Sequence, residues 1–329
     1  MRKSTLIWLI VAAALLLTGS ILFIAVMSAN NWDISAFSNR EYENHIYDIR
    51  EPFSDIIIHS DTADITFTTF AVDPTGKLDD QPSYVRVYED PKLRHEVSVQ
   101  NGVLVIELKD EKSWYDHINF YAMDNPSITI SLRQVQYGTL LIEEETGDVV
   151  IPEGLSFDNI LVSADTGDVC CYSSVSDRLG IQTSTGRIDV SDITASYLGL
   201  DAATGRITVS SVECDGFDAL VSTGRITLND IICKSFYSKG TTGDIRMTDV
   251  AVSGSMYIER STGDVEFERC DAAKVYIGTD TGDVSGSFLS PKVFTIQADN
   301  GRVDVPWTFT GGDCKVITDT GDIHITIEQ

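Results

Sequence analysis

The sequence is poor in cysteine, proline and basic residues. Six Cys and eight Pro in 329 residues are too few for a disulfide-stabilised scaffold or a proline-rich chain. Lys and Arg number 24 against 50 Asp and Glu, which gives a formal charge of −26. Nucleic acid and a bare anionic membrane surface repel a chain this acidic, so we expect neither as a partner. The apolar share of 43% is typical of a globular protein.

Motifs that support catalysis are also missing. The histidines are few and scattered, at His45, His59, His95, His117 and His324. There is no Gly-x-Ser-x-Gly elbow and no phosphate-binding loop. No Cys-x-x-Cys pair has the spacing of zinc ligands. We therefore expect no enzyme activity, no catalytic residue and no cofactor.

A long apolar segment lies at the start of the chain. Leu6–Met27 is interrupted only by Thr18, Gly19 and Ser20. As a helix it spans about 33 Å, enough for a hydrocarbon layer of ~30 Å. A cleaved signal peptide is the alternative, but its apolar stretch is shorter, about 7–15 residues. We expect an uncleaved transmembrane signal-anchor over 6–27, with a short tail at 1–5 and a tether at 28–41.

The charges around this segment indicate its orientation. Arg2 and Lys3 precede it, which places the N-terminus in the cytoplasm. The chain would then be a single-pass protein of a bacterial cell membrane with its bulk outside the cell. The exported part holds 22 basic and 50 acidic residues, a formal charge of −28.

A tetrapeptide, Thr-Gly-Asp/Arg-Val/Ile, recurs from residue 140 onward. Its glycine comes back every 19 or 20 residues, at Gly147, Gly167, Gly186, Gly205, Gly224, Gly243, Gly263, Gly282, Gly301 and Gly321. A fixed period near 20 is typical of a solenoid, in which each repeat buries its apolar side against its neighbours. Glycine at a fixed corner supplies a positive φ that other residues adopt poorly.

Alternation around each glycine identifies the kind of solenoid. The residue two positions after it is always Val or Ile, as in Ile188, Ile207 and Ile226. Apolar residues also alternate with polar ones before the glycine, which predicts strand, turn, strand and leaves no room for a helix. We predict an all-β fold: a single-stranded parallel β-solenoid of about ten coils over 136–329. An irregular β region at 42–135 would cap its start.

The pattern resembles the bacterial putative-adhesin family of β-strand-repeat domains, also called toast-rack domains. The resemblance covers about residues 50–329. It includes a degenerate repeat, Asp61-Thr62-Ala63-Asp64-Ile65, before the regular array. It implies an extracytoplasmic β-solenoid in the envelope of Gram-positive bacteria, in some cases linked to envelope stress systems, and it supplies no catalytic residues. This chain departs from the usual Asp at Arg187, Arg206, Arg225 and Arg302.

Three of these arginines occupy consecutive coils. Arg187, Arg206 and Arg225 would lie about 5 Å apart on the outer face, between blocks of aspartate. One interpretation is a solvated charged ridge with Asp–Arg pairs at the block boundaries. The other is a stripe that binds a phosphate- or carboxylate-rich polymer.

Two further questions stay open in the sequence. Cys214 and Cys233 hold one position in adjacent coils, so they are either buried thiols or a disulfide. Paired carboxylates at the corners, such as Asp165 with Asp168, suggest structural calcium, although the glycine-rich nonapeptide of calcium-binding β-rolls is absent.

Two classes of function remain. The first is a non-catalytic surface-binding, adhesin-like module that holds an envelope polymer. The second is a structural or sensory component of an envelope stress system that acts through a membrane protein partner. The oligomeric state is undetermined, but the final coil at 314–329 is expected to present an open edge for strand addition or dimerisation.

Overall fold

The computed structural model describes residues 3–29, 32, 42–70, 82–110 and 125–328. Helix α1 (Lys3–Ala29) comes first. Its Val11–Ala29 stretch is long and apolar enough to cross a membrane, a test that signal sequences also pass. Residues 1–2 and most of the expected tether at 28–41 lie outside the described residues. The remaining elements are all strands, which confirms the all-β prediction.

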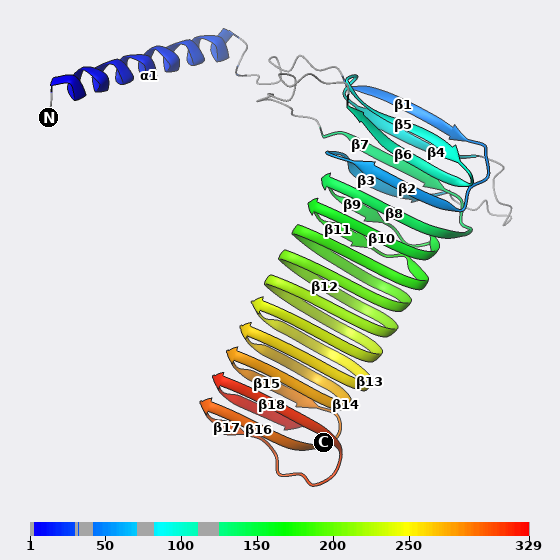
Figure 1. Ribbon diagram of the computed structural model, residues 1–329, viewed down its shortest axis with the longest axis vertical. Helices are drawn as coiled ribbons and strands as arrows, with labels where there is room; N and C mark the ends of the chain where they lie inside the picture. The colour runs from blue at the N-terminus through cyan, green and yellow to red at the C-terminus, as the bar shows by residue number, and fades with distance from the viewer. Residues whose placement is uncertain (1–2, 30–31, 33–41, 71–81, 111–124, 329) are drawn as a thin grey trace.

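From residue 136 the chain winds into a rod of stacked coils (Figure 1). Its strands are β8 (Gln136–Thr146), β9 (Val149–Ile151), β10 (Ser156–Thr166), β11 (Val169–Cys171), β12 (Ser174–Thr242), β13 (Ile245–Thr262), β14 (Val265–Thr281) and β15 (Val284–Phe288). Equivalent residues of successive coils pair in parallel, as in Val149 with Val169 and Val169 with Ile188. The predicted parallel β-solenoid is therefore confirmed.

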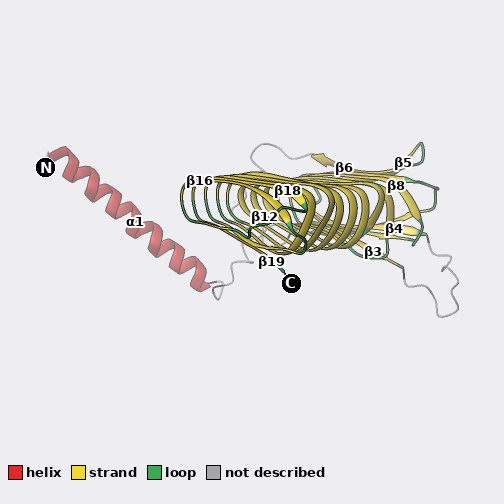
Figure 2. Cartoon of the chain, turned by 90° about the horizontal axis from the view of Figure 1, so that it is seen from below, coloured by secondary structure: helices red, strands yellow, loops and turns green. Residues whose placement is uncertain are grey.

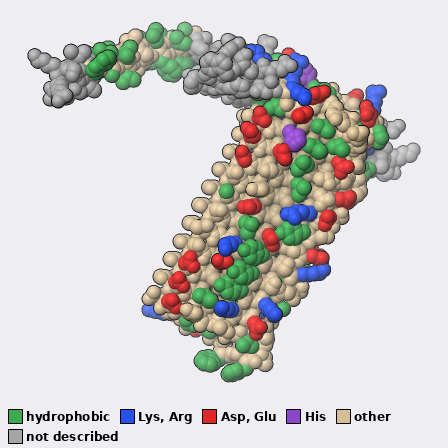
Figure 3. All heavy atoms as spheres, in the orientation of Figure 1, with side chains coloured by type: hydrophobic (Ala, Val, Ile, Leu, Met, Phe, Trp, Pro, Cys, Tyr) green, Lys and Arg blue, Asp and Glu red, His purple; other side chains and the backbone are tan. Residues whose placement is uncertain are grey.

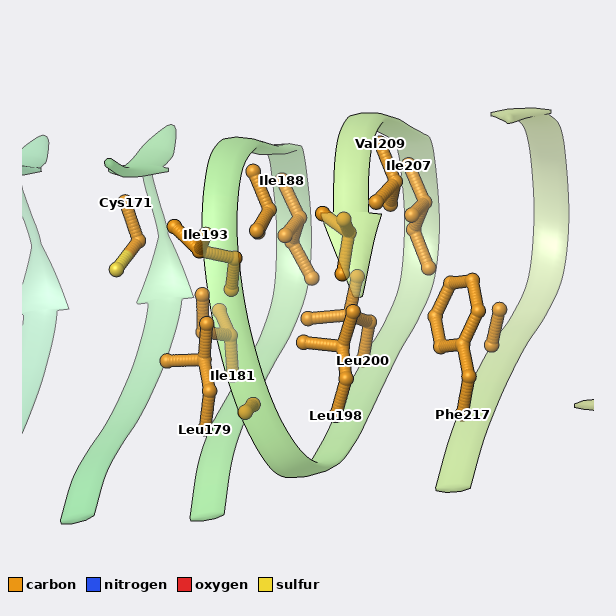
Figure 4. Packing of buried hydrophobic residues seen from close by; sticks show 14 of the residues in the cluster. Cys171, Leu179, Ile181, Ile188, Ile193, Leu198, Leu200, Ile207, Val209 and Phe217 are labelled. Atoms are coloured by element: carbon orange, nitrogen blue, oxygen red, sulfur yellow. The ribbon is translucent and has the colours of Figure 1, made fainter. Parts of the chain in front are cut away.

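The core runs inside the rod as columns of equivalent side chains. Ile188, Ile207 and Ile226 are 0% exposed, as the alternation requires. Figure 2 shows the coils as a flattened tube, and Figure 4 shows Leu198 and Leu200 pointing into the same interior as Ile207. Full burial of one such side chain stabilises the fold by about 1.5–3 kcal/mol. The buried side chains of each coil together therefore contribute several kcal/mol.

Close approach of neighbouring coils explains the glycine at every corner. A Cβ on Gly224 would lie 1.6 Å from the carbonyl oxygen of Gly205, and one on Gly147 would lie 2.4 Å from that of Ala63. Most corner glycines also have positive φ, for example +146° at Gly224, but Gly147 and Gly301 do not. The requirement common to all ten is thus the contact between backbones, with positive φ as a second one at eight of them.

The N-terminal strands extend the same sheet. They are β1 (Glu43–Ile49), β2 (Asp55–Ser60), β3 (Asp64–Thr69), β4 (Ser83–Glu89), β5 (Leu93–Gln100), β6 (Val103–Asp110) and β7 (Ser127–Leu132). Strands β2 and β3 form a coil that pairs in parallel with β8 and β9, so the degenerate repeat is a true coil. On its other side lie β6 and β7, also parallel. Antiparallel pairs β4–β7, β5–β6 and β1–β4 then cap this end.

The order of coils at the far end differs from the order in the sequence. Strands β18 (Gly312–Thr320) and β19 (Ile323–Ile327) pair with β14 and β15, and β16 (Lys292–Asn300) and β17 (Val303–Asp304) pair outside them. The final repeat therefore lies inside the rod. The expectation of an open edge at 314–329 is wrong, and the outer coil is 292–304. Equivalent coils fit on one another in any order, and the linker 305–311 is long enough to step back past one coil.

Candidate functional site

The residue after each corner glycine points out of the rod, and together these residues form one column. In the aspartate coils, one carboxylate oxygen accepts a hydrogen bond from the peptide N–H of the equivalent residue in the next coil. Asp148 Oδ1 accepts from Asp168 at 2.8 Å, and Asp264 Oδ1 accepts from Asp283 at 2.8 Å. The same bond recurs after Asp64, Asp168, Asp244, Asp283 and Asp322. We call this series the aspartate ladder.

The aspartate ladder stops at three consecutive coils. Arg187, Arg206 and Arg225 stand where the others have Asp, and a guanidinium carries donors but no acceptor. The peptide N–H groups of Arg206, Arg225 and Asp244 consequently receive no carboxylate from the neighbouring coil. We call Asp168, Arg187, Arg206, Arg225 and Asp244 the arginine stripe.

Among the described residues, the ion pairs of this arginine stripe lie at its two ends. Arg187 Nη2 lies 2.8 Å from Asp168 Oδ2, and Arg225 Nη2 lies 3.1 Å from Asp244 Oδ2. Arg206, in the middle, is exposed and makes no ion pair or side-chain hydrogen bond with the described residues. Three guanidinium groups and two carboxylates leave one net positive charge, centred on Arg206.

The arginine stripe borders a shallow hollow of about 700 Å³. Its floor is made by the corner glycines Gly186, Gly205, Gly224 and Gly243. Because these residues have no side chains, the hollow is open along the rod axis. Equivalent guanidinium groups repeat about every 4.8 Å along it. Such a row of forked donors suits phosphate or carboxylate groups carried on a linear chain.

A second group of polar side chains is buried near the capped end, and the sequence does not reveal it. His95 Nδ1 lies 2.8 Å from Glu89 Oε2, and His95 Nε2 lies 3.2 Å from Ser60 Oγ. Glu144 Oε1 accepts a hydrogen bond from the peptide N–H of Ala63 at 3.2 Å. Burial raises the pKa of Glu144 to about 7. One oxygen of Glu89 and one of Glu144 have no hydrogen-bond partner among the described residues.

This buried group has the residue types of a hydrolase triad but not its accessibility. Ser60 is 4% exposed, His95 4% and Glu89 1%. A nucleophile enclosed to this degree cannot meet a substrate without local opening of the sheet. We assign the group to the core of the capped end.

The two cysteines that share one position in adjacent coils are not joined by a disulfide. Cys214 and Cys233 are buried free thiols in adjacent coils, and a hydrogen bond between them lowers the pKa of Cys214 and raises that of Cys233.

Among the described residues, no group of three or more His, Cys, Asp or Glu side chains has a metal-binding arrangement. In the corner carboxylate pairs considered for calcium, Asp168, Asp283 and Asp322 each use one oxygen in the aspartate ladder.

Several solved bacterial structures have a similar fold. A putative adhesin from Bacteroides fragilis is 14% identical, with 88% of this chain and 97% of that chain covered and a TM-score of 0.39. A putative adhesin from Parabacteroides distasonis is 14% identical, covers 75% and 98%, and has a TM-score of 0.48. A putative lipid binding protein from the same species is 17% identical, covers 74% and 96%, and has a TM-score of 0.47.

Comparison at the sequence level gives a family. No curated protein matches the chain. The model of the Toastrack DUF4097 family matches residues 53–248 and 217–329, which together include all ten corner glycines and the capped end except β1. The chain therefore belongs to the Toastrack DUF4097 family.

Proposed function

We propose that this protein is a membrane-anchored, extracytoplasmic and non-catalytic binding module that holds an anionic polymer along its arginine stripe. The observation that carries the proposal is the interruption of the aspartate ladder at three consecutive coils. Seven coils use the position for a bond within the fold, whereas Arg187, Arg206 and Arg225 direct donors outward. Adhesin-like relatives in the fold comparison are consistent with a surface module.

The surrounding acidity limits what the arginine stripe can hold. At physiological ionic strength the Debye length is about 8 Å, so most of the distant carboxylates are screened from a ligand on the stripe. The ligand's own charges would lie within about 4 Å of the guanidinium groups, where attraction is strongest. A linear polymer with spaced phosphate or carboxylate groups fits this local field better than a globular anion does.

Anchoring by α1 sets the position of the binding surface. The basic Arg2 and Lys3 favour a cytoplasmic N-terminus, which leaves the rod outside the cell. The first strand, β1, begins at residue 43, so the capped end of the rod is the end near the membrane. The arginine stripe would then lie about midway along the rod.

Retention of the detergent-solubilised full chain on immobilised polyphosphate and on immobilised polyglutamate tests the proposal. Each charge-assisted hydrogen bond is worth about 1.5–3 kcal/mol, so Arg206→Gln should weaken retention about tenfold or more. Combined replacement of Arg187, Arg206 and Arg225 by Gln should abolish it. The matched control is Arg246→Gln, because Arg246 is exposed on the same rod and paired with Glu266 at 2.8 Å.

The two polymers distinguish phosphate from carboxylate as the recognised group. Equal retention of the wild type, the triple variant and the control on both polymers would contradict the proposal. Loss of retention in the control as well as in the triple variant would show that net charge alone decides binding, and would contradict it too.

A further inference from the structure

The far end of the rod exposes side chains that every other coil buries. Val303 stands at the inward position two residues after a corner glycine and is 49% exposed, whereas Val284 and Ile323 are 0% and 1% exposed at that position. Phe294 and Ile296, also inward-pointing, are only partly buried. The reason is that, in the part of the chain that the structure describes, no further coil covers β16 and β17. The end of the rod is therefore an open cross-section of the hydrophobic core.

The linker beside this cross-section adds aromatic side chains to it. Trp307 is 91% exposed and Phe309 is 84% exposed, and Leu289 and Val293 are 52% and 37% exposed. Thr308 donates a hydrogen bond to the carbonyl oxygen of Lys292, which fixes the linker to the outer coil. Hydrophobic side chains gather at this end of the rod in Figure 3. We call Leu289, Val293, Val303, Trp307 and Phe309 the distal patch.

A free strand edge accompanies the distal patch. Strand β16 pairs with β18 and β17 pairs with β19, and neither has a second partner among the described strands. Free edges with exposed apolar side chains are sites of strand addition. The opposite end is different, because its antiparallel cap ends in the charged strands β1 and β5, where Arg94 pairs with Glu43 at 2.7 Å.

We infer that the distal patch binds the distal patch of a second copy of this chain, end to end. Another solenoid end presents the same β edge and the same open apolar columns, so the two surfaces match in spacing and chemistry. Both charge signs are exposed there, with Arg302 between Asp299 and Asp304, which allows a two-fold arrangement to pair unlike charges. The charged cap blocks head-to-tail growth, so the contact closes as a dimer.

The acidity of the rod directs association to this end. Side-by-side packing would bring together surfaces of a chain with formal charge −26, which repel each other. The outer coil and its linker, residues 289–311, hold two basic and two acidic residues and are formally neutral. If the anchoring under Proposed function holds, the distal ends point away from the membrane, and the dimer joins chains on two facing membranes.

The experiment uses the full chain inserted singly into lipid nanodiscs, with dimerisation measured by sedimentation. The wild type should form paired nanodiscs, and hydrogen exchange at β16 should slow in the pair. Trp307→Ser with Phe309→Ser should weaken pairing at least tenfold without unfolding, since both side chains are exposed. Val303→Lys should do the same through a charge at the two-fold contact. The control Ile232→Ser, 54% exposed in the middle of the rod, should pair normally.

Three results would overturn the inference. They are single nanodiscs at concentrations up to about 100 µM, pairs that survive both distal variants, and binding of the distal patch to nanodiscs that contain lipid alone. The test is independent of polymer binding, because Arg206→Gln should leave pairing unchanged and the Trp307 and Phe309 variants should leave polymer retention unchanged.

Discussion

The aspartate coils and the arginine coils share one corner and use its outer position differently. Both have the glycine that permits backbone contact and the Val or Ile that fills the core. In aspartate coils the outer side chain binds the peptide N–H of the next coil, as Asp264 does for Asp283. In arginine coils the same position carries a donor that faces solvent. The comparison teaches that the glycine and the Val or Ile of the repeat build the coil, whereas the residue between them can change and is available for binding.

The largest effect should come from the part that both kinds of coil share. Gly224→Ala places a Cβ 1.6 Å from the carbonyl oxygen of Gly205 at a φ of +146°. Steric overlap and backbone strain together should lower the free energy of unfolding by about 3 kcal/mol or more. Gly167→Ala, in an aspartate coil, should cost a similar amount. Denaturant unfolding measures both.

Gly199→Ala is the control for these substitutions. Its new Cβ would meet side-chain atoms and no backbone atom, the nearest being in Tyr197 at 3.0 Å and Arg178 at 3.6 Å. A small cost for Gly224→Ala, similar to that of Gly199→Ala, would contradict the explanation of the corner.

The next effect concerns a carboxylate that belongs to neither group. The folded state holds the pKa of Glu144 at about 7, against 4.5 in the unfolded chain, because of burial. Between these values the unfolded state releases a proton that the folded state keeps, so stability falls as pH rises from 4.5 to 7. The loss should reach roughly 3 kcal/mol above pH 7.

Glu144→Gln should remove this pH dependence. The difference in unfolding free energy between the variant and the wild type should grow in the variant's favour from pH 4 to pH 8. A difference that stays constant over this range would contradict the assignment.

A smaller effect separates the two kinds of coil directly. Asp264→Ala removes the acceptor for the peptide N–H of Asp283 and should cost about 1 kcal/mol. Asp264→Asn keeps an acceptor oxygen and should restore most of that stability. Arg206→Ala should change stability by less than about 0.5 kcal/mol, since its side chain has no partner among the described residues. Equal losses of stability for Asp264→Ala and Arg206→Ala in thermal unfolding would contradict the proposed difference between aspartate and arginine coils.

A small gain in stability should come from converting one coil into the other kind. Arg206→Asp would provide a carboxylate for the peptide N–H of Arg225 and lie between two guanidinium groups. We expect stability to rise by about 0.5–1 kcal/mol while polymer retention is lost. Retention at the wild-type level in this variant would show that the arginine stripe is not the binding surface.

The repeat was sufficient to predict the rod and its core. Strict alternation around Gly186, Gly205 and Gly224 placed Ile188, Ile207 and Ile226 inside, and they are fully buried. The stacking order at the far end could not be predicted, because equivalent coils fit each other in any order. The position of the coil at 292–304 on the outside of the rod is therefore known only from the structure.

Part of the candidate site could be predicted from the sequence. The periodicity placed Arg187, Arg206 and Arg225 in one column, but it could not show that Asp at this position binds a peptide N–H, since that bond joins residues about 20 apart. The buried contact of Ser60 with His95 was hidden for a similar reason. Ser60 lies in β2 and His95 in β5, and no local sequence pattern indicates that these two strands bring the side chains into contact.

The central claim is that the arginine coils bind an anionic chain. Its most direct test is a titration of the full chain in nanodiscs with polyphosphate, followed through the side-chain N–H signals of its arginines by NMR. We predict that Arg206 shifts first and furthest, that Arg187 and Arg225 follow, and that Arg246 and Arg302 stay in place. A uniform shift of all arginines, or none at Arg206 when the polymer is bound, would contradict the account.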